Sequence, residues 1–177
     1  MEIKVIEISG FRSALMALRL PFGKEVRSKT YHNTKLLNNI MVSGGEIEFD
    51  EKDLILMSSL IKKGDEHAKA IRGINVTLEI NTPRYIWQEL DTYVVGVTRL
   101  SSESTMHIQG KGLSEAELVE MKHNLIEGTL QRRISVFNYQ ALRRIYFQRK
   151  DHRLPQWREF CKFIETLPYA DKLITIQ

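Results

Sequence analysis

The sequence of 177 residues contains a single cysteine, Cys161. One thiol cannot form a disulfide bond within the chain. Cys161 lies in the stretch Glu159–Ile164, where the apolar residues follow helical spacing and no histidine is adjacent in sequence. We therefore expect a packed or half-buried thiol on an amphipathic helix, and not a catalytic nucleophile.

Long apolar runs are also missing, since no stretch approaches the roughly 18 consecutive apolar residues of a membrane-spanning helix. The first residues lack the basic and then apolar layout of a signal peptide. Hydrophobic residues make up 42% of the chain and charges of both signs are present, which is ordinary for a globular protein. We expect a single cytoplasmic domain over residues 1–177, with no membrane partner.

Acidic residues are scarce near the C-terminus. Between Gln131 and Arg158 there are eight Lys or Arg and one acid, Asp151, in a chain whose formal net charge is +4. Such a basic segment serves nucleotide phosphates, nucleic acid or simply a solvated helix face.

The periodicity of the first half predicts both strands and helices. Alternating residues indicate strands over Glu2–Ile8, Glu46–Phe49 and Ile74–Asn81. Asp50 can cap a helix that ends at Gly64, and Pro83 suits the first turn of another that reaches Leu90.

The second half alternates between irregular and helical patterns. Residues 94–112 lose periodicity and predict a long irregular segment of the kind that often carries function. Ser114 and Glu117 form a Ser-x-x-Glu capping box, so a helix should begin there. Further helices are expected over about Arg132–Lys150 and from Pro155 to Leu167.

The predicted basic helix places two polar residues on one stripe. Residues 11 apart on a helix lie within about 20° of one another, and Asn138 and Arg149 have this spacing. Ala141, Leu142 and Ile145 fall between them, so an amide and a guanidinium could flank an apolar patch and point at one ligand. The alternative is that Asn138 bonds locally and Arg149 extends into water.

The stretch from Asn138 to Arg149, followed by Gln156–Glu159, resembles the C-terminal motif of the flavin-dependent thymidylate synthases, also called thymidylate synthase complementing proteins. That motif reads Asn-x-Arg, a second Asn four residues on, an Arg five residues beyond, and then Ala-Gln-Trp-Glu-Ile. Asn138 and Arg149 match, whereas Gln140 replaces the first arginine and Arg144 the second asparagine. The resemblance implies that Arg149 contacts the pyrimidine and that Asn138, Gln140 and Arg144 lie at the flavin.

Two upstream segments and Lys122 extend the resemblance, which covers about residues 64–165. Gly64–His67 and Val76–Pro83 are similar to the family's histidine segment and to the strand that follows it, which implies a flavin contact for His67. Lys122 lies sixteen residues before Asn138, where the family has an arginine for the nucleotide phosphate.

The family's Arg-His-Arg signature, followed seven residues later by Ser, is altered here. Alignment on Ser104 places residues 94–96, Val-Val-Gly, at Arg-His-Arg, so both arginines are absent. A second alignment uses Arg99 with Ser102 and restores only one arginine. The hydroxyls and the guanidinium of Thr98–His107 could form an anion site, or the segment could be a plain loop. The resemblance assigns Arg99 and Ser104, together with Lys122, to phosphate.

The resemblance implies an α/β (α+β) fold with a small antiparallel or mixed sheet packed with long helices. It also implies a homotetramer whose active sites are each built from several chains. The activity would be C5 methylation of deoxyuridine monophosphate, a pyrimidine deoxynucleotide, with FAD as cofactor and NADPH and methylenetetrahydrofolate as co-substrates. No enzyme nucleophile is involved, so the protein's contribution would be positioning and electrostatics.

Two other functions compete with this one. Loss of the double arginine favours a non-catalytic descendant that binds a nucleotide or another protein. Single-stranded nucleic acid, the least favoured partner, would use the basic region 132–158 with stacking aromatic residues. These aromatic residues are Tyr139, Tyr146, Phe147 and Trp157.

Overall fold

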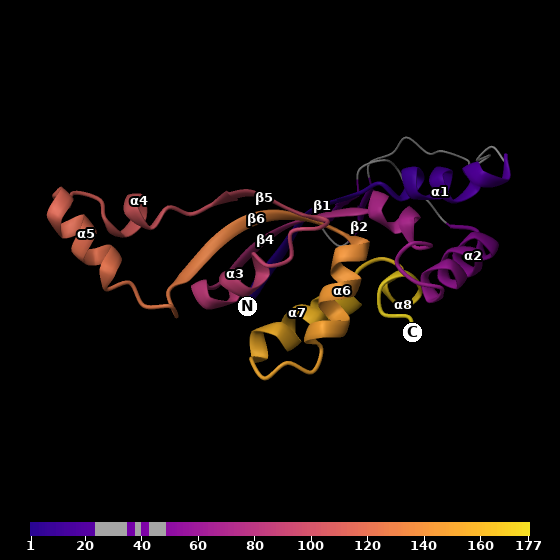
Figure 1. Ribbon diagram of the computed structural model, residues 1–177. Coiled ribbons are helices and arrows are strands. Elements are labelled where there is room, and N and C mark those ends of the chain that lie inside the picture. Colours follow the sequence, from indigo (N-terminus) through magenta and orange to yellow (C-terminus); the bar gives the residue numbers. More distant parts are fainter. Residues whose placement is uncertain (24–34, 38–39, 43–48) are drawn as a thin grey trace.

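The computed structural model describes residues 1–23, 35–37, 40–42 and 49–177. Within these residues the strands form one sheet in the order β2-β3-β1-β4-β6-β5 (Figure 1). Neighbouring described strands are antiparallel, except that β1 runs parallel to β3. The strands are β1 (Glu2–Ser9), β2 (Lys35–Leu37), β3 (Ile40–Val42), β4 (Asn75–Pro83), β5 (Val97–Ser102) and β6 (Leu130–Asn138).

Helices connect and cover these strands. The α-helices are α1 (Phe11–Arg19), α2 (Glu51–Lys62), α3 (Arg84–Leu90), α4 (Thr105–Gln109), α5 (Glu115–His123), α6 (Tyr139–Arg149), α7 (Pro155–Glu165) and α8 (Ala170–Leu173). Two short 3-10 helices are η1 (Leu20–Phe22) and η2 (Lys69–Gly73). The α+β class with a mixed sheet is therefore confirmed.

Strand β4 lies at the centre of the sheet and confirms its predicted alternation. Val76, Leu78 and Ile80 are fully buried, whereas the intervening polar side chains are partly exposed. Strand β4 pairs with β1 on one side and with β6 on the other, from Asn75 opposite Asn138 to Pro83 opposite Leu130. One face of the sheet thus belongs to the core and the other is polar.

Helices α3, α6 and α7 lie on the core side of the sheet (Figure 1). Leu142 and Ile145 of α6 and Trp157 and Phe160 of α7 are all fully buried against it. At roughly 25 cal/mol per Å² of apolar area, each of these side chains contributes about 2 kcal/mol or more to stability.

Several predicted elements are confirmed. Strand β1 covers the predicted Glu2–Ile8, and the carboxylate of Asp50 accepts from the Lys52 backbone N–H at 3.2 Å at the start of α2. Helix α3 begins directly after Pro83, α7 begins at Pro155, and the capping box opens α5. Residues 46–48 of the strand predicted at Glu46–Phe49 lie outside the described residues.

The single helix predicted over Arg132–Lys150 is wrong in its first part. Residues up to Asn138 form strand β6, which pairs with β4 and β5, and helix α6 begins only at Tyr139. The side chain of Arg133 lies on the core side of β6, where its guanidinium stacks on Trp87 at 4.6 Å from the ring centroid. A charged residue on the inner face hides the apolar alternation that would have indicated a strand.

The irregular segment predicted at 94–112 is also wrong in part, because it contains β5 and the short helix α4. Strand β5 pairs only with β6, at the edge of the sheet, and most of its residues are exposed. An edge strand with few buried residues shows little alternation between apolar and polar residues, so its sequence does not indicate a strand.

Between β5 and β6, residues 103–129 form an arm that carries α4 and α5 away from the rest of the molecule (Figure 1). Helix α5 buries no residue. Five of the arm's apolar side chains are exposed by 39% or more: Met106, Ile108, Leu113, Val119 and Ile126. In the described part of the chain, no helix combines the length and the apolar character needed to cross a bilayer.

Candidate functional site

The polar residues of α6 meet one short segment, residues 93–96, which follows α3. The Asn138 backbone N–H donates to the Gly96 carbonyl at 2.9 Å. The Arg144 guanidinium donates to the Val95 carbonyl, and Arg149 Nε donates to the Tyr93 hydroxyl at 2.8 Å. The 93–96 segment therefore runs antiparallel to α6 and joins the predicted site residues Asn138, Arg144 and Arg149.

Gly96 allows this close approach. Its φ of +80° lies in the left-handed region, and a Cβ built on it would lie 2.6 Å from the Asn138 side chain. That side chain caps α6, because Asn138 Oδ1 accepts from the Ala141 backbone N–H at 2.8 Å. Asn138 is thus occupied locally, which was the alternative interpretation of this residue.

The predicted ligand-facing stripe of α6 is wrong. Ala141, Leu142 and Ile145, which lie between the two polar ends, are all fully buried in the protein. Asn138 is a cap and not a helical residue, so the 100° spacing does not apply to its side chain. The shared neighbour of Asn138 and Arg149 is the 93–96 segment instead.

Arg149 lies in a partly buried cluster of polar and aromatic groups. Its Nη1 donates to Glu89 Oε2 at 2.6 Å, and the same oxygen accepts from Trp157 Nε1 at 2.9 Å. The guanidinium carbon lies 4.5 Å from the Trp157 ring centroid and 5.6 Å from that of Tyr93. His152 Nε2 is 2.9 Å from Arg149 Nη1. These contacts hold the guanidinium in one orientation.

One terminal nitrogen of Arg149 stays available to a ligand. Nε and Nη1 have the partners given above, whereas Nη2 donates to no residue in the described part of the chain. The Arg149 side chain is 18% exposed. An oriented guanidinium with a free terminal nitrogen can donate to a carbonyl or a phosphate oxygen.

Three of the four residues assigned to flavin are hydrogen-bonded within the chain. Gln140 is 5% exposed; its Oε1 accepts from Arg72 Nε at 2.6 Å and its Nε2 donates to the Asp65 carbonyl at 3.0 Å. His67 has a half-exposed side chain, 3.8 Å from Glu66.

Asn138 caps α6 and Arg144 donates to the Val95 carbonyl, while Arg144 Nε is buried with no hydrogen-bond partner among the described residues. Within one chain, Gln140 and Asn138 are thus engaged with other residues, whereas His67 is half exposed and the Nε of Arg144 has no partner in the described part of the chain.

The three residues assigned to phosphate are separated. Lys122 of α5 donates to the Thr105 hydroxyl, and Ser104 accepts from the His107 backbone N–H at 3.4 Å as the cap of α4. Ser104 lies at the start of the arm and Lys122 lies in its helix α5, whereas Arg149 is the last residue of α6 in the body of the molecule (Figure 1). Arg99 lies on β5 and pairs with Asp91.

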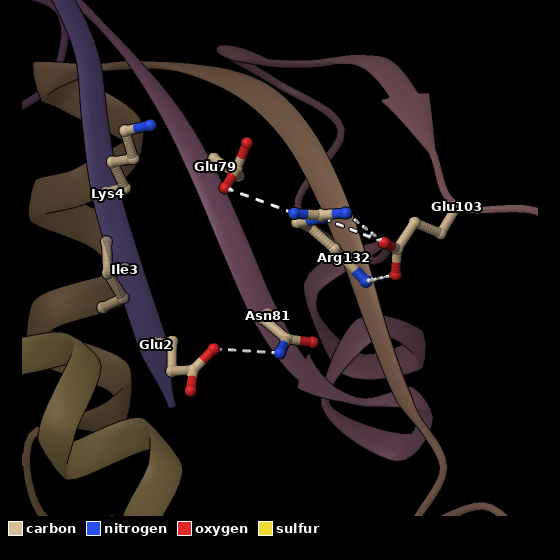
Figure 2. Close-up of a pocket in the computed structure, with 7 residues that line it drawn as sticks. All are labelled: Glu2, Ile3, Lys4, Glu79, Asn81, Glu103 and Arg132. Carbon is tan, nitrogen blue, oxygen red and sulfur yellow. Dashed lines mark hydrogen bonds and ion pairs between the residues drawn. The ribbon is translucent and has the colours of Figure 1, made fainter.

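A polar cavity of about 430 Å³ opens on the sheet face opposite α6 and α7, and none of the predicted site residues lines it. Figure 2 shows Arg132 between Glu79 and Glu103, and Asn81 donating to Glu2. The Arg132 backbone N–H and its guanidinium donate to the Glu103 carboxylate and lower its pKa. These charges largely neutralise one another.

The aromatic residues proposed for nucleic-acid stacking do not form an exposed face. Tyr139 and Trp157 are fully buried, and burial raises the pKa of the Tyr139 hydroxyl. Cys161 is buried as expected, and burial raises the pKa of its thiol to about 11. An unreactive thiol is what its sequence context indicates.

Sequence reasoning missed Glu89 and Tyr93, which hold Arg149. A signal was present, since the two lie four residues apart, with Glu89 near the end of the helix predicted from Pro83 and Tyr93 shortly after it. A carboxylate and a phenol at this spacing can bind one guanidinium.

The same fold occurs in flavin-dependent thymidylate synthases. One crystal structure of ThyX from Helicobacter pylori complexed with FAD and dUMP superimposes with a TM-score of 0.66 at 14% sequence identity, covering 99% of this chain and 98% of that one. A second, also with FAD and dUMP, gives a TM-score of 0.67 with the same identity and coverage. No protein-family model and no curated protein matches the sequence. The likeness extends over nearly the whole of both chains and concerns the fold.

Proposed function

We propose that this protein binds a pyrimidine deoxynucleotide, deoxyuridine monophosphate, with the guanidinium of Arg149 at the pyrimidine. The observation that carries the proposal is the state of Arg149, which is oriented by Glu89 and Tyr93 and keeps Nη2 free among the described residues. The fold supports it, because both similar structures contain dUMP.

The nucleotide site is proposed to involve more than one chain. Lys122 and Ser104 lie at or in the arm, and Arg149 lies in the body (Figure 1). The arm of one copy can place its Lys122 and Ser104 beside Arg149 of another copy. A homotetramer with composite sites, as the resemblance implies, would bring these groups together.

The nucleotide is proposed to bind without flavin. The side chains of Asn138, Gln140 and Arg144 are hydrogen-bonded within the chain, and the double arginine of the family signature is absent. This favours the non-catalytic descendant over an active enzyme.

A second candidate is flavin-mediated methylation at C5 of the nucleotide, with NADPH and methylenetetrahydrofolate as co-substrates. One observation favours it, namely that both similar structures hold FAD together with dUMP.

Calorimetric titration of the full-length protein with deoxyuridine monophosphate, with and without FAD, tests the proposal. Arg149→Lys keeps the charge but loses the planar fork, so we expect about tenfold weaker binding. Arg153→Lys is the matched control, because Arg153 is exposed and lies four residues further on. Equal affinities of the two variants, or no binding by the unmodified protein with or without FAD, would refute the assignment. Binding that appears only with FAD would favour the second candidate.

A further inference from the structure

His152 lies in the turn between α6 and α7, and each of its ring nitrogens faces a hydrogen-bond donor. Nδ1 accepts from the Leu154 backbone N–H at 3.2 Å, and Nε2 lies 2.9 Å from Arg149 Nη1. The nitrogens of a backbone amide and of a guanidinium can donate a hydrogen bond but cannot accept one. Each of the two contacts therefore requires a lone pair on the ring.

The His152 ring cannot meet both requirements at once, because a neutral imidazole has one N–H and one nitrogen lone pair that can accept. With the proton on Nδ1, Nε2 accepts from Arg149 and the Leu154 N–H loses its partner. With the proton on Nε2, the Leu154 contact is kept and two donors face each other at Arg149. A doubly protonated ring accepts from neither. The hydrogen bond from Arg149 thus exists in only one of the three protonation forms.

The charges around His152 determine what a second proton on the ring would do. Among the described residues, the surrounding charged groups are Arg149 of α6, Glu89 of α3, Arg158 of α7 and the exposed chain neighbours Asp151 and Arg153. Glu89 Oε2 lies 3.8 Å from His152 Nε2, and Arg158 Nη1 donates to the His152 carbonyl at 2.6 Å. The His152 side chain is 26% exposed, so water screens these charges only in part. An imidazolium would repel Arg149 and attract Glu89, the carboxylate that holds Arg149.

We propose that His152 is a positioning residue that holds the Arg149 guanidinium through its neutral ring and releases it when the ring is protonated. Loss of the Nε2 contact leaves Nη1 with Glu89 as its partner among the described residues, and the imidazolium competes for that carboxylate. Histidine changes its charge between about pH 5 and 8, so the orientation of Arg149 should vary with pH in this range. The consequence for nucleotide affinity rests on the proposed function, whereas the coupling of His152 to Arg149 does not.

Trp157 provides a signal of this coupling that needs no ligand. Its Nε1–H donates to Glu89 Oε2, the same oxygen that accepts from Arg149 Nη1. Trp87, the other tryptophan of the chain, donates to the Gln131 carbonyl at 2.8 Å and serves as an internal reference. Acidification of the full-length protein from about pH 7.5 to about 5.5 spans the range in which histidine titrates. In proton–nitrogen NMR we expect the indole resonance of Trp157 to shift over this range and that of Trp87 to stay.

Two variants separate the positioning of Arg149 from a purely structural role in the turn. The amide oxygen of asparagine can take the place of Nδ1, so His152→Asn keeps an acceptor for the Leu154 N–H. The longer glutamine side chain can bring its oxygen to the place of Nε2, so His152→Gln keeps an acceptor for Arg149. Neither amide titrates, so both variants should lose the acid shift of the Trp157 resonance. His123→Gln, at the exposed end of α5, is the control and should keep that shift.

The affinity for deoxyuridine monophosphate, measured by calorimetry, is the second readout. At neutral pH we expect His152→Gln to bind like the unmodified protein and His152→Asn to bind about tenfold more weakly, since one contact to a charged group is lost. On acidification, the Kd of the unmodified protein should rise about tenfold more than the Kd of His152→Gln. The phosphate of the ligand titrates in the same range, but equally for every variant, so this ratio isolates the effect of His152.

The outcomes distinguish this proposal from the proposed function. A Trp157 shift that is absent from the unmodified protein, or that persists in both His152 variants, overturns the positioning role. Equal nucleotide affinities of His152→Asn and His152→Gln would reduce His152 to a turn residue and overturn it as well. If the Trp157 shift depends on His152 but deoxyuridine monophosphate binds at no pH, the coupling to Arg149 is supported and the proposed function is refuted.

Discussion

At the scale of single residues, the carboxylate of Glu89 connects two elements. One oxygen, Oε2, accepts from Arg149 at the end of α6 and from Trp157 of α7. Trp157 is fully buried, and its indole N–H has this one partner among the described residues. Glu89 is therefore both a structural contact and the group that orients the proposed base-binding residue.

Glu89→Gln should lower both stability and nucleotide affinity. The neutral amide cannot replace a charge-assisted contact to Arg149, and we expect a loss of about 1 to 2 kcal/mol in the free energy of unfolding, measured with urea. The control is Glu120→Gln, because Glu120 is exposed on α5 and should change stability by less than about 0.5 kcal/mol. If the two variants unfold at the same urea concentration, the bridging role of Glu89 is wrong.

At the scale of elements, α5 has a capping box at its N-terminal end and does not pack into the protein core. Ser114 N–H donates to Glu117 Oε2 at 2.8 Å, and the hydroxyl does so at 2.7 Å, which lowers the pKa of the Glu117 carboxyl. The helix buries none of its own residues. Its local stability should therefore depend on the capping box more than on the protein core.

Ser114→Ala tests this independence. Amide hydrogen exchange within α5 should become about fivefold faster, since a lost cap costs about 1 kcal/mol. The urea midpoint of the whole protein should not move. Ser101→Ala, at an exposed position of β5, serves as the control for both measurements. An equal drop in local and global stability would show that α5 unfolds together with the core.

The elements also show what a sequence can and cannot predict. Strand β4 could be predicted because its apolar residues lie on one face and its polar residues on the other. Helices α2 and α5 could be predicted because their N-terminal caps are local signals. Strand β6 could not, because Arg133 faces inwards. Its burial depends on Trp87 and Asp91, which lie more than 40 residues away in sequence.

The candidate site divides in the same way. Arg149 could be predicted from a motif, since its type and spacing are local properties. Its partners Glu89 and Tyr93, and the pairing of Asp91 with Arg99 and Arg133, depend on tertiary contacts that α3 and the residues after it make with α6, β5 and β6. The four-residue spacing of Glu89 and Tyr93 is compatible with a shared partner, but it does not identify that partner as Arg149.

At the scale of the whole molecule, the arm is the feature that a single chain does not explain. Its short helices project from the body (Figure 1), with apolar side chains in contact with solvent. Ile108 is 60% exposed and Ile126 is 72% exposed. Exposed apolar groups gathered on one projection are typical of a surface that another protein covers.

The double variant Ile108→Asp/Ile126→Asp should shift the proposed homotetramer towards smaller species. Light scattering after size-exclusion chromatography, at several protein concentrations, measures the change. Ile55→Asp is the matched control, because Ile55 is 62% exposed on α2 in the body and should leave the mass unchanged. A monomeric unmodified protein would remove the composite nucleotide site from consideration.

The 93–96 segment belongs to the connection between α3 and β5, and β5 in turn leads into the arm. A ligand that displaces the Tyr93 ring from Arg149 would therefore also shift strand β5, from which the arm projects. Occupation of the proposed base site would thus be coupled to the position of the arm through these four consecutive residues. Ligand binding at one nucleotide site would then change the ligand affinity of the neighbouring site in the assembled protein.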